Sequence, residues 1–145
     1  MPLDPDLAAW LRLSLTPGLG GEALRRLLTA LGGPQQVLAA RRGELARYVG
    51  AALAASIPEY DATAALSAAG AWLEDPANDI VTLADTRYPR QLLQIPDPPP
   101  LLHVKGRVEL LSRPALAIVG SRNATARWRT NWPRAARSFP SFRSA

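Results

Sequence analysis

Apolar residues recur at helical spacing through the first half of the chain. A leucine stripe marks one face of an expected helix: Leu24, Leu27, Leu28 and Leu31. Three- and four-residue steps between apolar positions are typical of an amphipathic helix. Asp4 before Pro5 predicts the start of an earlier helix, because Asp caps helix N-termini and proline suits the first helical turn. Residues 4 to about 74 are therefore expected to be helical.

The pattern changes after Pro76, where short apolar runs replace the helical spacing. Three runs predict strands: Ile80–Leu83, Leu101–Lys105 and Ala115–Val119. Prolines between the runs, above all in the Asp97–Pro100 segment, enforce extended backbone and disfavour helix. We therefore place a domain boundary near residues 75–79. Residues 1–75 are expected to form a helical domain, and residues 76–125 to begin an α/β domain.

Basic charge is concentrated at the C-terminal end of the chain. The sequence has 17 Lys and Arg against 12 Asp and Glu, a net charge of +5. Residues 1–121 carry 11 basic and 12 acidic side chains, whereas residues 122–145 carry six arginines and no acid. The body of the chain is therefore almost neutral. An argument for nucleic-acid binding from net charge rests on the last 24 residues alone.

Composition excludes several kinds of site. Cys is absent, which rules out disulfides, thiolate catalysis and cysteine-ligated metals, and the single His103 disfavours a histidine metal site. No two carboxylates stand at a spacing typical of general acid–base catalysis. We therefore expect no catalytic residue, no metal and no cofactor. Without a run of 18 apolar residues or a signal-peptide pattern, we expect no membrane association and a cytoplasmic protein.

The first candidate site is the turn between the first two expected helices. Its Pro-Gly-Leu-Gly sequence matches a helix-hairpin-helix pattern, in which backbone N–H groups at a helix N-terminus approach a DNA phosphate. The candidate contacts are Gly18, Leu19 and Gly20. A glycine turn that simply closes a helical bundle explains the same residues, and both interpretations remain open.

The second candidate is the loop that follows the Ala115–Val119 run. A buried strand that ends in Gly-Ser-Arg resembles the phosphate corner of a Rossmann-like sheet, where ligands lie beyond the strand ends. The candidate nucleic-acid contacts are Gly120, Ser121, Arg122, Asn123 and Thr125. The spacing lacks the Gly-x-Gly-x-x-Gly fingerprint and no Walker lysine follows, so an ordinary strand-to-loop turn also fits.

Residues 126–145 combine arginines with aromatic residues. Cations interleaved with rings can bind single strands by phosphate contact and base stacking. The aromatic members are Trp128, Trp132, Phe139 and Phe142. The segment has neither helical nor strand periodicity, and Pro133 and Pro140 interrupt it.

From Thr82 onward, a specific combination of motifs emerges. Tyr88-Pro89, the Asp97–Pro100 segment, Gly106 and the Gly-Ser-Arg block at 120–122 stand in this order along the chain. In this combination the chain resembles the DNA-processing protein A family (DprA, also called Smf). The N-terminal helices with their Pro-Gly-Leu-Gly turn look like the SAM-like/helix-hairpin-helix domain of that family. The resemblance covers residues 1 to about 125.

The resemblance implies a protein of natural transformation that binds single-stranded DNA. Such proteins protect incoming strands during competence and help to load the RecA recombinase. Their Rossmann-like domain binds the DNA and forms a homodimer. Gly120, Ser121 and Arg122 match the DNA-contacting loop, with Arg122 as the cation that binds phosphate. Because the family has no established catalytic residue to transfer, the resemblance implies binding and no enzyme activity.

The sequence departs from the family pattern after about Thr125, where Arg127-Trp128 stand in place of Tyr-Gly. We therefore expect residues 126–145 to be a non-homologous basic tail, disordered or produced by a shift of reading frame. The expected fold is α+β or α/β: a helical SAM-like/helix-hairpin-helix domain and the truncated start of a Rossmann-like parallel sheet, with the family's dimer surface missing. Two alternatives remain: a stand-alone helix-hairpin-helix DNA-binding module, and a fragment of a Rossmann-like nucleotide-handling enzyme.

Overall fold

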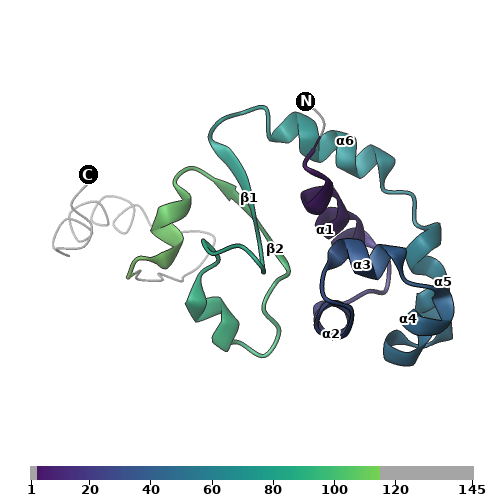
Figure 1. The fold of residues 1–145 in the computed structure, drawn as a ribbon. Helices are drawn as coiled ribbons and strands as arrows, with labels where there is room; N and C mark the ends of the chain where they lie inside the picture. Colours follow the sequence, from purple (N-terminus) through teal and green to yellow (C-terminus); the bar gives the residue numbers. More distant parts are fainter. Residues whose placement is uncertain (1–2, 115–145) are drawn as a thin grey trace, which may run out of the picture. The chain divides into compact units, whose positions relative to one another are not determined.

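A computed structural model of the protein describes residues 3–114 (Figure 1). The chain divides into two compact units, Met1–Ser112 and Arg113–Ala145, and all of the elements below belong to the first. Within residues 3–114, no helix has the length and apolar character that a membrane span requires. The expected strand Ala115–Val119 and the expected tail 126–145 lie outside the described residues.

The first part of the described chain is helical, as the sequence predicts. Its helices are α1 (Pro5–Leu15), α2 (Gly21–Leu31), α3 (Pro34–Ala39), α4 (Arg42–Val49), α5 (Ala51–Glu59) and α6 (Thr63–Trp72). The cap at Asp4 is confirmed, because its carboxylate accepts hydrogen bonds from the N–H groups of Asp6 and Leu7 at 2.9 and 3.1 Å. Gly32 ends α2 with a φ of +102°, a conformation that glycine adopts without strain.

One hydrophobic core joins the first five helices. Its buried members are Trp10, Leu13, Leu19, Leu24, Leu27, Val37, Leu45, Ala54 and Ile57. The leucine stripe of α2 faces this core: Leu24 and Leu27 are completely buried, and Leu28 and Leu31 pack against them from partly buried positions. Helix α6 differs, because none of its residues is fully buried.

Two strands follow the helices and pair as an antiparallel sheet, β1 (Asn78–Thr82) with β2 (Leu101–Lys105). Ile80 lies opposite His103 in the register, and Ile80 and Val81 are buried. Helices with a small sheet place the described residues in the α+β class. The sequence predicts the start of a parallel sheet, whereas the two described strands run in opposite directions; the third strand expected there lies outside the described residues.

Polar contacts organise the long connection between the strands, which contains the 3₁₀ helix Arg90–Gln94. The Arg87 guanidinium pairs with Asp79 and Asp85, which raises the pKa of Arg87. Hydrogen bonds from the Arg87 side chain to Asp85 lower the pKa of that carboxyl group. The buried Tyr88 donates its hydroxyl hydrogen to the carbonyl oxygen of Pro99 at 2.8 Å. A second 3₁₀ helix, Val108–Ser112, follows β2.

Candidate nucleic-acid interface

The helix-hairpin-helix candidate is the turn from Thr16 to Gly20, which joins α1 to α2. Gly18 has a φ of +80°, so the bend needs a residue without a Cβ. Leu19 is buried in the helical core and anchors the turn there. The Leu19 N–H donates to the Thr16 carbonyl at 3.1 Å, and the Gly20 N–H donates to the Gly18 carbonyl at 3.2 Å. Two of the three candidate residues thus already use their N–H groups inside the turn.

This geometry bears on both interpretations of the turn. The burial of Leu19 and the internal hydrogen bonds are what a turn that closes a helical bundle requires. A phosphate could bind at the turn only by contacting groups that these hydrogen bonds leave free, or by replacing one of the bonds. DNA contact at Gly18, Leu19 and Gly20 stays a prediction.

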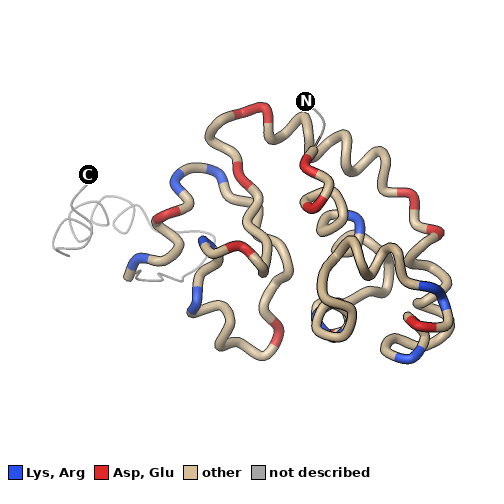
Figure 2. The backbone as a smooth tube through the Cα atoms, viewed as in Figure 1, with Lys and Arg blue, Asp and Glu red and all other residues tan. Residues whose placement is uncertain are grey.

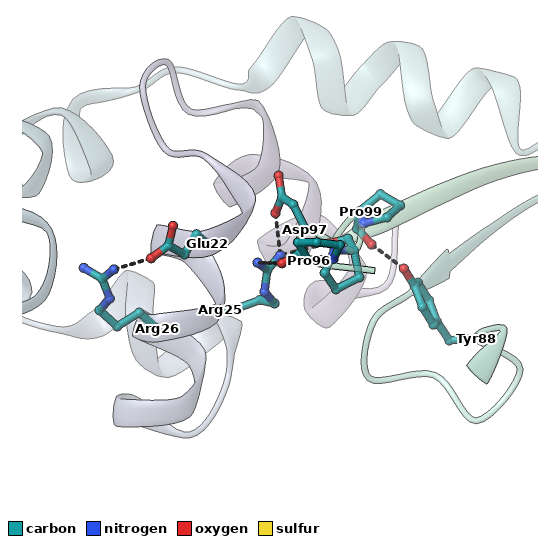
Figure 3. Close-up of polar contacts among 8 residues, drawn as sticks. Glu22, Arg25, Arg26, Tyr88, Pro96, Asp97 and Pro99 are labelled. Carbon is teal, nitrogen blue, oxygen red and sulfur yellow. Dashed lines mark hydrogen bonds and ion pairs between the residues drawn. The ribbon is translucent and has the colours of Figure 1, made fainter. Parts of the chain in front are cut away.

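The two cations that follow the turn on α2 are both engaged (Figure 3). Arg26 donates to the Glu22 carboxylate at 2.7 Å and to the Tyr48 carbonyl at 3.1 Å. Arg25 donates to three groups of one distant segment: the Asp97 carboxylate at 2.8 Å, the Pro98 carbonyl at 3.0 Å and the Pro96 carbonyl at 3.4 Å. Neither guanidinium therefore stands free beside the turn.

Asp97 lies directly against the start of α2. A Cβ atom built on Gly21 would come within 2.6 Å of the nearer Asp97 carboxylate oxygen, so this approach depends on glycine at that position. The sequence places Asp97 in the proline segment but does not reveal Arg25 as its partner. No local signal could have revealed it, because Arg25 and Asp97 are 72 residues apart in the chain.

Charges of both signs are interspersed over the described part of the chain (Figure 2). Further ion pairs join Arg42 to Glu59 and Lys105 to Asp75. Basic side chains without an ion pair among residues 3–114 are Arg12, Arg41, Arg47, Arg90 and Arg113. They are spread along the chain in ones and twos, so the described residues carry no concentrated basic stripe of the kind that nucleic-acid-binding domains present. Within the same residues, no group of three or more His, Asp or Glu could hold a metal ion.

The described part of the chain also has an apolar groove. Side chains of α1, α6 and β2 line a groove of about 720 Å³, and at its edge the rings of Trp72 and His103 meet edge to face with centroids 5.5 Å apart. His103 is exposed on β2.

The other candidate contacts, Gly120, Ser121, Arg122, Asn123 and Thr125, lie outside the described residues, as do the arginines and aromatic residues of the tail. Their roles rest on the sequence alone.

Comparison with known proteins gives one match. Residues 79–140 match the family model for DNA recombination-mediator protein A, which confirms the family resemblance. No curated protein and no solved structure matches the chain. The matched segment begins at residue 79 rather than at residue 1, and it extends to residue 140, past the departure expected near Thr125. The match associates the chain with DNA processing and recombination.

Proposed function

We propose that this chain, a relative of recombination-mediator proteins over residues 79–140, binds single-stranded DNA. In this role it would protect incoming strands during natural transformation and help to load a RecA-type recombinase. The observation that carries the proposal is that the matched segment includes the Gly-Ser-Arg loop at residues 120–122.

The chemistry of the loop supports phosphate contact. Gly120, which has no Cβ, would let the backbone approach a ligand, and Ser121, Asn123 and Thr125 would supply short hydrogen-bonding side chains. Arg122 supplies a planar, permanently charged fork that suits phosphate oxygens. We infer binding rather than catalysis, because the five candidate residues include no His, Asp, Glu or Lys that could act as a general base.

The same proposal includes a division of the chain into three parts. Residues 1–75 would be a SAM-like/helix-hairpin-helix domain, residues 76–125 the start of a Rossmann-like domain, and residues 126–145 a separate basic tail.

A second candidate function is a stand-alone helix-hairpin-helix module. The observation that favours it is local: two helices of eleven residues each flank a short turn whose Gly18 has a positive φ. Under this candidate, DNA affinity would depend on the turn and survive the loss of Arg122.

The test compares two arginine variants in binding to fluorescent oligo-dT. Arg122→Ala should weaken binding by about tenfold and reduce the slope of log K against log salt by about 1, because one phosphate contact is lost. Arg41→Ala removes the same charge from an exposed site that has no ion pair among the described residues, and it should change affinity far less. If Arg122→Ala binds as the unaltered chain does, while removal of residues 127–145 abolishes binding, the loop is not the site and the tail is merely polycationic.

A further inference from the structure

The side chain of Arg25 and the Pro96–Pro98 segment form a closed set of contacts, which we call the Arg25–Asp97 clasp. Three hydrogen bonds hold the guanidinium, two of them to main-chain carbonyls and one to the Asp97 carboxylate (Figure 3). The Arg25 side chain is 22% exposed, whereas that of Asp97 is 71% exposed. The cation is thus largely covered, while its carboxylate partner faces water.

The clasp is fixed from both sides. On the helical side, Gly21 has no Cβ, and that absence is what lets the carboxylate reach the start of α2. On the sheet side, the Tyr88 hydroxyl holds the Pro99 carbonyl and thereby fixes the end of the same proline segment (Figure 3). The carboxylate therefore meets Arg25 in a defined position.

We propose that the clasp is an autoinhibitory contact, in which Asp97 occupies Arg25 in place of a nucleic-acid phosphate. This inference rests on the proposed DNA binding and extends it to the Thr16–Gly20 turn. A guanidinium binds carboxylate and phosphate oxygens with the same fork geometry, so one oxyanion can replace the other. When the clasp opens, the turn gains the cation that it otherwise lacks.

Two features would let a phosphate replace the Asp97 carboxylate at Arg25. An ion pair with an exposed partner is weak and sensitive to salt, so an incoming phosphate can compete for the guanidinium. Asp97 also comes from a segment remote from α2 in sequence, whereas Arg26 is held by Glu22 from its own helix. Binding at the turn would therefore release the Pro96–Pro98 segment, which lies within the family-matched residues.

The first experiment opens the clasp without a change of charge. The methyl group of Gly21→Ala would come within 2.6 Å of an Asp97 carboxylate oxygen and 3.1 Å of Nη1 of Arg25. It should therefore separate these two flexible side chains and raise the affinity for oligo-dT by roughly three- to tenfold. Gly33→Ala is the matched control. Its added methyl would meet a flexible side-chain end, Oε1 of Gln36 at 2.7 Å, and no residue of the clasp within 4 Å.

The second experiment opens the clasp by removing its anion. Asp97→Asn should raise affinity to a similar extent and steepen the salt dependence by about 1, because Arg25 becomes available for one phosphate contact. Glu44→Gln makes the same charge change on an exposed carboxylate without an ion pair among residues 3–114. The gain in Asp97→Asn should disappear in the double variant with Arg25→Gln.

The outcomes separate this inference from the proposed function. If the chain binds oligo-dT through Arg122 but Gly21→Ala and Asp97→Asn bind no better than their controls, the autoinhibitory role is refuted and the loop proposal stands. If Glu44→Gln gains as much as Asp97→Asn, net charge explains the effect and the inference fails. If Arg122→Ala has no effect while both clasp variants gain affinity, the loop proposal fails and the turn is the binding site. Thermal unfolding of each variant verifies that it is folded.

Discussion

The helices and the strand pair of this protein are stabilised in different ways. Nine buried side chains, contributed by the first five helices and the α1–α2 turn, form one apolar core. Beyond α6, the buried apolar side chains among the described residues are Ile80, Val81, Tyr88, Pro89 and Pro98, and much of the connection is held by Arg87 and by the Tyr88 hydroxyl. The comparison teaches that the helices depend on burial, whereas the strand connection depends on directed polar contacts. Residues 79–114, the described part of the family match, fall in the strand pair, its connection and the residues after β2.

The largest expected effect concerns the helical core. Leu24→Ala should lower the free energy of unfolding by about 2–5 kcal/mol, because it leaves a cavity at a site that is completely buried. Leu93→Ala, at a position 52% exposed in the strand connection, should cost no more than about 0.5 kcal/mol. Urea unfolding of both variants measures the difference. Equal losses would show that the helices do not depend on this core.

A smaller effect is expected from the hydroxyl group that fixes the proline segment. Tyr88→Phe keeps the buried ring but removes the donor to the Pro99 carbonyl, and should cost about 1 kcal/mol. Tyr60→Phe is the control, because the Tyr60 hydroxyl has no hydrogen-bond partner within the described range, residues 3–114. If the two variants are equally stable in urea, the bond to Pro99 does not stabilise the connection.

The smallest effect is a dependence of stability on pH at Asp85. Arg87 lowers the pKa of this carboxyl group in the folded protein below its ordinary value of 3.8. The ion pair therefore stabilises the fold fully above the unfolded pKa, and this contribution is lost as the pH falls through the lowered folded pKa. The free energy of unfolding falls as the pH drops below 4, and it should fall less steeply in Asp85→Asn than in the unaltered chain. A decline as steep as that of the unaltered chain would contradict this assignment.

Much of the local structure could be predicted from the sequence, because its causes are local. The Asp4 cap and the leucine stripe of α2 were read correctly since capping and helical spacing involve neighbours in the chain. The expected strands at 80–83 and 101–105 differ from β1 and β2 by at most two residues at any end. Less of the candidate site could be predicted from the sequence. The glycines reveal the turn, but nothing in the sequence reveals the ion pair between Arg25 and Asp97.

The sequence alone predicts the helices of the first half, the two described strands, the near-neutral body and the basic C-terminal end, because periodicity, capping and composition are properties of short segments. The tertiary structure decided which groups those segments present to one another. Only the folded chain pairs β1 with β2 in antiparallel register, buries Leu19 in the turn, and brings Asp97 to Gly21 and Arg25. These contacts join residues far apart in sequence, and they form because packing of the helices and the strand connection leaves those partners within hydrogen-bond distance.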